Sequence, residues 1–399
     1  MVSTDKIIED VKKEKENIYS FLRDIIAIPS FDRTEGDVIH YVKEKMENLR
    51  FDKVFIDPMG NVIGKIGNGT HVVAFDAHLD TVDTGNINDW SFDPFDGMED
   101  DKIIGGRGAC DQKGGMASML YAAKLLLKYG VPDNLTIYFV GTVFEENYEG
   151  VSWKYIVEED EIIPEMVIST EPTNMNVCIG HRGRTDILIE VMGKTAHGSM
   201  PWLGENAIER MADIIREIQT LSLRTDGFLG KGTITISGIK SEAPSKCAVP
   251  DKCSIRIDRR LTVGETPKSA VDELENLSII KQYSAKVRIE EIYEETWTKY
   301  PIKIDCRFPA WKMSTDHILC SYALSSINEI TGNEHMFTKW NFSTNGVFIN
   351  GEYKIPCVGL GPGFEEQAHT IDEYTTKQQL LDATAAYILL IEKIGDYYK

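Results

Sequence analysis

The sequence predicts an α/β protein built on a mainly parallel sheet, with an α+β unit inserted into it. Three observations lead to this prediction. Apolar, strand-like runs alternate with amphipathic helical segments up to about residue 183. The pattern changes near Arg184 to short segments of alternating polarity, and the first pattern returns after about residue 297. We therefore expect residues 1–183 and 297–399 to form one domain and residues 184–296 to form the inserted one.

The first domain is expected to begin with two helices. Apolar residues recur at helical spacing in the N-terminal segment, and residues 36–49 have the pattern of a second helix. KVFID, NVIGKI and HVVAFDAH follow as strands, and residues 115–129 form a long helix rich in Ala, Met and Leu. NLTIYFVGTVF and EMVIST are continuous apolar runs, typical of strands buried on both faces. This order predicts a parallel sheet, and ligands bind beyond the carboxyl ends of such strands.

The inserted domain is predicted as β-α-β-β-α-β. RTDILIEVMG, GTITISGI, CSIRIDRRL and AKVRIEEIY alternate in polarity as strands do, while residues 206–221 and 267–280 have helical periodicity. The segment TWTKYPIKIDCRFPAW is expected to be irregular. Helices near 315–331 and at 376–394, with CVGLG between them, then complete the first domain.

Composition narrows the class of protein. A chain of 399 residues is too long for one ordinary domain, and its formal net charge of -20 speaks against binding to nucleic acid or to an anionic membrane. Seven cysteines without a CxxC pair indicate a reducing compartment. The N-terminal segment has no signal-peptide core, and no apolar run approaches the ~18 residues of a membrane span. We expect a cytoplasmic protein.

Side chains that can ligate a metal stand at the ends of the apolar runs. They are His78 and Asp80 in AFDAHLDT, Asp111 in GRGACDQKGG, Glu145 and Glu146 in VGTVFEEN, Glu171 in ISTEPT, and His369 in EEQAHTID. Imidazoles and carboxylates brought together from distant strand ends are the ligands of a zinc-type hydrolytic site. The pattern predicts this chemistry and leaves the substrate open.

Most of these motifs, taken singly, also have a simpler explanation. A bare HxD arises by chance, and glycines around Asp111 commonly mark a turn. Glu145 and Glu146 are more specific, because two carboxylates that close a buried strand are desolvated unless a cation compensates them. Adjacent side chains diverge, so one can ligate a metal while the other acts as a base. Among the remaining histidines, His197 lies between small residues in GKTAHGSMP, which would present its ring openly.

HLDT, the later D-x-K-G, the EE pair, the EP and the late AH resemble, in this order, the zinc-dependent aminoacylase and carboxypeptidase superfamily. That superfamily includes acetylornithine deacetylase, succinyl-diaminopimelate desuccinylase and N-carbamoyl amino acid hydrolases. The resemblance covers essentially the whole chain, including the inserted domain. KCAVPDKCSIRIDRRLTVGET and NFSTNG are similar to a bacterial subgroup of selenium-metabolism-linked hydrolases.

The resemblance implies two divalent metal ions, with zinc favoured and manganese or cobalt as alternatives. It implies that His78 and Glu171 hold one ion, that Glu146 and His369 hold the other, and that Asp111 bridges the two. It also implies a cis peptide bond directly after the bridging aspartate.

The resemblance further implies the catalytic roles. Glu145 would act as general base toward a metal-activated water, and Asp80 would orient His78. His197 would stabilise the oxyanion, usually from the partner subunit of a homodimer that forms through the inserted lid and dimerisation domain.

Substrate contacts are implied for a further set of residues. Arg260, with Arg259 as the alternative, would grip a substrate carboxylate, and the backbone of Gly361 and its neighbours would contact substrate. Two positions depart from the superfamily pattern. Cys247 stands where relatives often have Asn, and Asn345 stands where many have Asp, so both are expected to line the substrate pocket.

The predicted function is cleavage of an acyl, carbamoyl or peptide amide bond in a small amino-acid derivative. A dipeptidase or carboxypeptidase is one alternative. The other is an inactive metal-containing binding protein on the same fold, and the presence of Glu145 counts against it. A phosphate-transferring enzyme has no support, because the sequence contains no P-loop motif.

Overall fold

The computed structural model describes residues 2–399, and the chain divides into two compact units. Unit 1 comprises Met1–Gly180, Glu294–Ile302 and Lys312–Lys399, and unit 2 comprises His181–Tyr293 and Lys303–Trp311. The insertion begins and ends within a few residues of the predicted limits. The second stretch of unit 2 was expected in the first domain. It belongs to unit 2 because β17 (Arg307–Phe308) pairs with β9 (Gly183–Met192).

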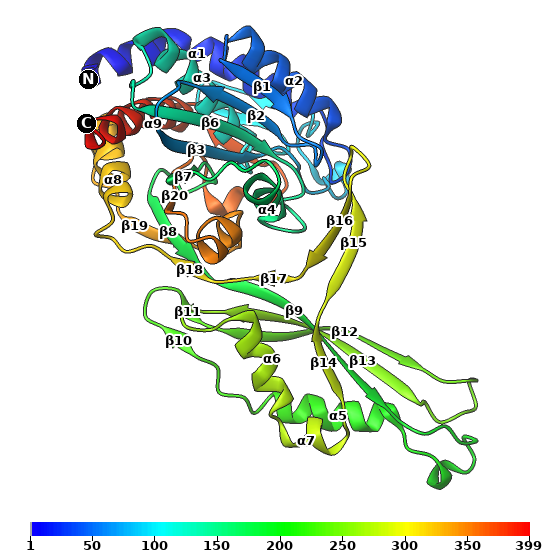
Figure 1. Ribbon diagram of the computed structural model, residues 1–399. Helices are drawn as coiled ribbons and strands as arrows, with labels where there is room; N and C mark the ends of the chain where they lie inside the picture. Colours follow the sequence, from blue (N-terminus) through cyan, green and yellow to red (C-terminus); the bar gives the residue numbers. More distant parts are fainter. Residues whose placement is uncertain (1) are drawn as a thin grey trace. The chain divides into compact units, whose positions relative to one another are not determined.

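Unit 1 is built on a nine-stranded sheet whose central strands are parallel (Figure 1). The parallel neighbours are, in order, β6 (Leu135–Thr142), β3 (His71–His78), β7 (Met166–Ser169) and β20 (Cys357–Gly359). Antiparallel strands β2 (Val62–Ile66) and β1 (Lys53–Ile56) extend the sheet beyond β6. Beyond β20 lie β8 (Val177–His181), β18 (Trp311–Lys312) and β19 (Phe337–Trp340). The predicted mainly parallel sheet is thus confirmed.

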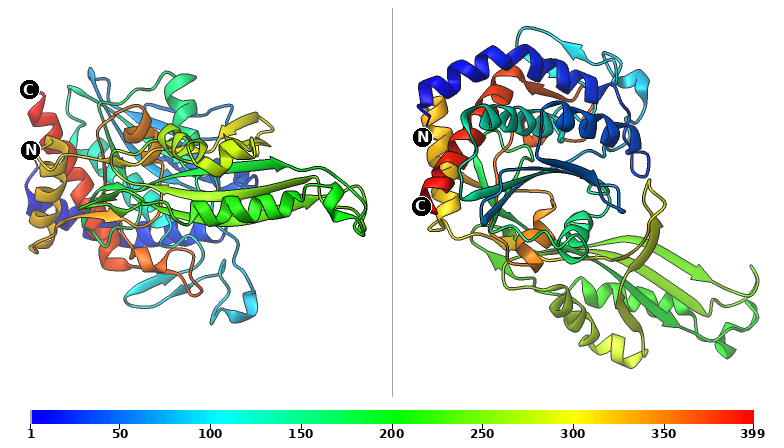
Figure 2. Two further views of the ribbon diagram at one scale, coloured as in Figure 1. Left: turned by 90° about the horizontal axis from the view of Figure 1, so that it is seen from below. Right: turned by 45° about the horizontal axis from the view of Figure 1, so that its top comes forward.

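Helices cover both faces of this sheet. α1 (Thr4–Ile26), α3 (Lys113–Tyr129) and α9 (Lys377–Tyr397) pack together on one face (Figure 2), and α8 (Ile318–Thr331) packs against α9. α4 (Val151–Glu158) lies on the other face, and α2 (Gly36–Asn48) packs on β1 and β2. Because neighbours surround α3 and α9, both are apolar around most of their circumference.

Unit 2 contains an antiparallel sheet of order β12 (Thr233–Glu242), β13 (Lys252–Leu261), β9 and β14 (Lys286–Ile289). α5 (Ala207–Ile218), α6 (Pro267–Glu275) and α7 (Ser278–Gln282) pack against it over a common apolar core. The predicted β-α-β-β-α-β order is observed, with one difference. The second helix is broken in two, because the carboxylate of Glu217 accepts the backbone N–H groups of Ser278 and Ile279 and starts a new helix there.

The segment expected to be irregular, residues 296–311, instead contains the second strand of a hairpin. β15 (Glu291–Glu295) pairs with β16 (Pro301–Asp305), and β14 ends before it at Ile289. Pro301 begins β16, and proline is tolerated at the first residue of a strand. The short elements are η1 (Ile87–Asp89), β4 (Met98–Glu99), β5 (Ile103–Gly105), η2 (Pro201–Leu203), β10 (Thr225–Asp226), β11 (Gly230–Lys231), η3 (Val347–Glu352), η4 (Glu365–Gln367) and β21 (Tyr374–Thr376). Across residues 2–399, no helix combines the length and apolarity that crossing a bilayer requires.

Candidate metal centre

Three of the parallel strands carry predicted ligands at their carboxyl ends. His78 is the last residue of β3, Glu145 and Glu146 follow β6, and Glu171 follows β7. β3 lies between β6 and β7, with His78 opposite Thr142 in the register. Parallel strands end at the same edge of a sheet, so these side chains converge there.

Asp111 and His369 reach the same place from loops. Asp111 lies just before α3, and His369 lies between η4 and β21. Nε2 of His78 is 2.9 Å from Oδ1 of Asp111, and Nε2 of His369 is 3.3 Å from Oδ2. The two oxygens of one carboxylate therefore face two different imidazoles, which is the placement that a ligand bridging two ions needs.

Each imidazole has further carboxylates beside it. Nε2 of His78 lies 3.8 Å from Oε1 of Glu171 and 3.9 Å from Oε2 of Glu145. Nε2 of His369 lies 2.8 Å from Oε2 of Glu146. His78, Glu145 and Glu171 are buried, whereas the side chain of His369 is 51% exposed. The site thus has an inner position and an outer position, joined by the bridging carboxylate.

The site carries more negative charge than its imidazoles balance. Burial and nearby carboxylates raise the pKa values of Glu145 and Glu171 well above their usual range, and burial with Asp111 raises the pKa of Glu146 to about 7. Hydrogen bonds to Asp111 and Glu146 raise the pKa of His369 to about 10. Burial opposes a low pKa at Asp111, but hydrogen bonds from the two imidazoles outweigh it and hold that pKa well below its usual range.

Two divalent cations fit this arrangement. Across residues 2–399, Oε2 of Glu171 is among the buried oxygens without a hydrogen-bond partner. Leaving such an oxygen unpaired costs free energy, and a cation would satisfy it. The potential ligand atoms of His78, Asp111 and Glu146 lie close to one another. The same holds for those of His78, Glu145 and Glu171. Mixed imidazole and carboxylate donors suit zinc, and also manganese or cobalt.

Asp80 supports the site through its backbone as well as its side chain. The ring N–H at Nδ1 of His78 donates to the carbonyl oxygen of Asp80 at 2.8 Å, while the nearest carboxylate oxygen of Asp80 is 3.7 Å away. This bond fixes the tautomer and leaves Nε2 of His78 free to ligate a metal. The Asp80 carboxylate instead accepts the backbone N–H of Glu146 at 2.8 Å. The orienting role expected of the carboxylate thus falls to the carbonyl.

The backbone is strained at two positions in the site. Phe144, just before the glutamate pair, has φ 66°, and His369 has φ 61°. Both lie in the left-handed region that non-glycine residues rarely adopt, and such outliers gather at functional sites. The Asp111–Gln112 peptide bond is cis, as the resemblance implied.

Three supporting residues were not predicted. Arg107 and Glu373 form a buried ion pair of 2.7 Å, and Glu373 also accepts the backbone N–H of Asp111 at 3.0 Å. Lys113 is buried and donates to the carbonyl oxygens of Ile25 and Ile28 at the end of α1, and burial lowers its pKa to about 7. A lone arginine in the glycine-rich GGRGAC was the one signal available for the pair.

Two predicted substrate contacts in unit 1 are instead engaged within the protein. The side-chain amide of Asn345 donates to Asp76 and Thr142, and its oxygen accepts the backbone N–H of Gly150. Gly361 donates to Oγ1 of Thr173 and accepts from the same residue. These contacts give Asn345 and Gly361 structural roles, and their contact with substrate stays a prediction. A Cβ on Gly361 would lie 2.0 Å from the carbonyl oxygen of Thr170, which explains the glycine.

The other predicted residues lie in unit 2. His197 is exposed, and its Nδ1 lies 2.7 Å from Oγ of Ser199. Arg260 makes a two-point ion pair with Asp258, at 2.8 and 2.9 Å, and remains partly exposed. The alternative, Arg259, is buried among acidic partners, so the two arginines point to opposite sides of β13 as the alternation requires. Cys247 is an exposed free cysteine.

A second group of potential ligands lies in unit 2 and comprises Asp186, Glu290 and Cys306. Arg256 pairs with Asp186 at 3.3 Å and with Glu290 at 2.7 Å. Burial and the two carboxylates raise the pKa of the Cys306 thiol to about 12. Because the guanidinium of Arg256 already pairs with both acids, we assign no metal ion to this group.

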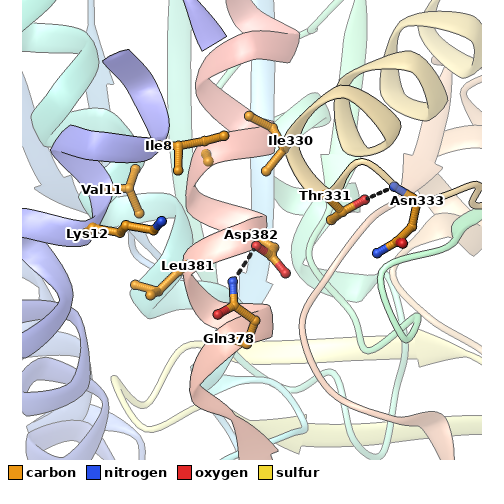
Figure 3. A pocket seen from close by; sticks show the side chains of 10 residues that line it. Ile8, Val11, Lys12, Ile330, Thr331, Asn333, Gln378, Leu381 and Asp382 are labelled. Atoms are coloured by element: carbon orange, nitrogen blue, oxygen red, sulfur yellow. Dashed lines mark hydrogen bonds between the residues drawn. The ribbon is translucent and has the colours of Figure 1, made fainter. Parts of the chain in front are cut away.

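The pocket shown in Figure 3 lies between α1, α8 and α9 and has a volume of about 380 Å³. Its lining combines apolar side chains such as Leu381 and Ile330 with polar ones such as Asp382, which accepts a hydrogen bond from Gln378 at 2.8 Å. None of the predicted site residues lines it.

Comparison with known proteins identifies a family and relatives of this chain. The model of peptidase family M20/M25/M40 matches residues 74–393. The Escherichia coli protein YgeY is 47% identical over 383 residues, which cover 96% of this chain and 95% of the relative. A Staphylococcus epidermidis protein named probable succinyl-diaminopimelate desuccinylase is 31% identical over 214 residues, 52% of each chain.

Solved structures show the same fold. The aminopeptidase PepT of Bacillus cereus matches with a TM-score of 0.74 at 21% identity, covering 95% of this chain and 98% of that one. The YXEP protein of Bacillus subtilis, described as a dinuclear metal binding peptidase of the M20 family, matches with a TM-score of 0.71 at 15% identity, covering 96% and 99%. At these identities the likeness extends to the fold alone.

Proposed function

The chain belongs to peptidase family M20/M25/M40, and on that premise we propose that it is a dinuclear metal-dependent amidohydrolase. The substrate would be a small amino-acid derivative with an acyl, carbamoyl or peptide amide bond. One observation carries the proposal: the carboxylate of Asp111 lies between His78 and His369, with one oxygen toward each imidazole.

The distances within unit 1 support the ligand roles that the resemblance implies. His78 and Glu171 would hold the inner ion, His369 and Glu146 the outer ion, and Asp111 would bridge them. Zinc suits this donor set best, with cobalt and manganese as alternatives. When bound, such ions lower the pKa of a water molecule and polarise the amide carbonyl.

Glu145 is the proposed general base. Its Oε2 lies beside His78 while its Oε1 has no partner among the described residues, so one oxygen remains available to a water molecule. The Glu145 carboxylate takes a proton from that water as the water attacks the amide carbon. Glu145 then passes a proton to the leaving nitrogen. Its burial excludes competing water, which strengthens each electrostatic contact in the site.

Unit 2 would complete the enzyme. We propose that His197 donates to the developing oxyanion and that Arg260 exchanges its bond with Asp258 for one with a substrate carboxylate. A homodimer joined through unit 2 would supply His197 from the partner subunit. The long edge strand β12, which exposes Ile239, supports such pairing. The seven free cysteines support a cytoplasmic location.

Two substrate classes have separate support. The desuccinylase name of one relative favours an N-acyl amino acid, and the peptidase description of the family favours a short peptide. N-acetyl, N-succinyl and N-carbamoyl amino acids and dipeptides should therefore be screened with added zinc, manganese or cobalt. Hydrolysis that needs the metal and is lost in Glu145→Gln would support the proposal. Metal binding without hydrolysis of any panel member would favour a binding protein on this fold.

A further inference from the structure

The buried ion pair of Arg107 and Glu373 lies between loops that carry the proposed ligands. Nη1 of Arg107 is 2.7 Å from Oε2 of Glu373, and both side chains are nearly fully buried. Glu373 follows His369 by four residues, and Arg107 precedes Asp111 by four. One contact thus joins two segments that are far apart in the sequence and that both supply proposed ligands.

Glu373 holds the backbone that presents Asp111. Its Oε1 accepts the N–H groups of Cys110 at 2.8 Å and of Asp111 at 3.0 Å. Its Oε2 accepts the N–H of Gly108 at 3.1 Å besides the guanidinium of Arg107. Every acceptor position of the carboxylate is used, so the peptide that carries the bridging side chain has little freedom to rotate.

Arg107 also contacts the loop after His78. Its Nη2 donates to the carbonyl oxygen of Asp83 at 3.3 Å, and its guanidinium lies over the ring of Trp90, 5.1 Å from the ring centroid. The backbone carbonyl of Glu373 also accepts the N–H of Gly106 at 2.8 Å. The pair therefore contacts three segments, which follow His78, precede Asp111 and follow His369.

We propose that the Arg107–Glu373 pair is a positioning device that sets Asp111 and His369 at the distance required to hold the outer metal ion. The inference rests on the proposed metal centre. Residues that orient ligands in this way typically change metal affinity 10–100-fold when they are replaced. A buried ion pair is in itself weak evidence for a stabilising role, whereas these hydrogen bonds end on the backbone of the bridging ligand itself.

Glu373→Gln is the direct test, because the new amide group would face the guanidinium and the Gly108 N–H, which are both donors. Manganese binding to the purified apoprotein should be measured by calorimetry, with metal content measured after dialysis. We expect one ion per chain to bind as in the wild type and affinity for the second to fall 10–100-fold. If substrate is known, kcat should recover at high manganese concentration while KM stays unchanged.

Two further variants complete the test. Arg107→Lys keeps the charge but loses the planar fork, so it should weaken the second ion less than Glu373→Gln does, and it answers the question if that variant does not fold. Asp10→Asn is the matched control. Asp10 is another buried carboxylate, on α1, and it pairs with Lys6 at 2.8 Å and with Lys128 at 2.9 Å. Lys128 lies near the C-terminal end of α3, ~22 Å along that helix from Lys113.

The outcomes separate the inference from the proposed function. Asp10→Asn should lower the unfolding temperature and still bind two ions. Wild-type binding of both ions by Glu373→Gln, or by Arg107→Lys where Glu373→Gln is unfolded, would overturn the positioning role. An equal loss in Asp10→Asn would show general destabilisation and would overturn it as well. A wild-type protein that binds fewer than two ions would refute the metal centre itself.

Discussion

The carboxylate of Asp80 accepts a hydrogen bond from the backbone N–H of Glu146 at 2.8 Å. This bond fixes the turn after β6, at which one glutamate side chain lies beside His78 and the next beside His369. Asp80 thereby links the strand that carries the inner imidazole to the backbone of an outer ligand. Its side-chain carboxylate supports the proposed outer metal position, and its backbone carbonyl supports the proposed inner one.

Replacement of Asp80 should therefore affect the two metal positions unequally. Asp80→Asn keeps an oxygen that can accept the Glu146 N–H, so we expect little change. Asp80→Ala should weaken the outer position by 10–100-fold and spare the inner one, because His78 donates to the backbone carbonyl that alanine retains. Anomalous scattering from manganese in crystals of each variant would give the occupancy of each position. Preferential loss at the inner position would contradict this assignment.

The Glu145→Gln variant tests whether Glu145 acts as the base rather than as a metal ligand. The amide cannot take up a proton, so kcat should fall by ~10²–10⁴-fold while both ions remain bound. Glu146→Gln should lower the content of the outer ion as well, since Nε2 of His369 and Oε2 of Glu146 are only 2.8 Å apart. Metal analysis and turnover on the same preparations test both statements. Near wild-type kcat in Glu145→Gln would mean that another group is the base.

Because His181 is buried and neutral in the folded protein, we expect the folded state to lose stability in acid. Its Nδ1–H donates to the carbonyl of Arg182, and its Nε2 accepts from the indole N–H of Trp311 at 2.7 Å, so the folded ring is neutral. Burial, with a smaller effect of the Arg260 charge, lowers its pKa from 6.5 to about 4. The unfolded chain therefore binds the extra proton first, and stability is lost as pH falls from about 6.5 to about 4.

The expected loss from this group is roughly 3 kcal/mol, from 1.36 kcal/mol per pKa unit. Chemical unfolding of the wild type and of His181→Gln at a series of pH values measures it. The variant should be less stable at pH 7.5 but should lose less stability between pH 6.5 and 4. Parallel pH profiles in the two proteins would show that His181 does not titrate as described.

Most of the proposed ligands could be selected from the sequence because they follow a strand or precede a helix that the local sequence specifies. Glu145 and Glu171 follow apolar runs long enough to be recognised as buried strands, and parallel strands end at one edge. The Arg107–Glu373 pair was not predictable in this way, since 266 residues separate its partners and neither follows a long apolar run in the sequence. Only the folded chain shows that a carboxylate after the last ligand reaches back to the bridging one.

Departures from the local pattern have physical causes. Asn345 was expected to line the substrate pocket, and in the folded chain its amide group bonds to Asp76, Thr142 and Gly150. The predicted helix over 267–280 is two helices, because a side chain from α5 caps the second one. Hydrogen bonds between residues distant in sequence override the local pattern in both places.

His197 provides the last test, because it lies in unit 2 while the proposed ligands lie in unit 1. Loss of an oxyanion donor typically slows turnover by ~10²–10³-fold, so His197→Ala should keep its metals and lose turnover to that extent. In a heterodimer of His197→Ala and Glu145→Gln subunits, purified with two different tags, a histidine that acts across the interface restores one complete site. About half of the wild-type activity should then return. A heterodimer no more active than its parents would show that His197 acts within its own chain or has no part in turnover, and a wholly monomeric protein would rule out the exchange.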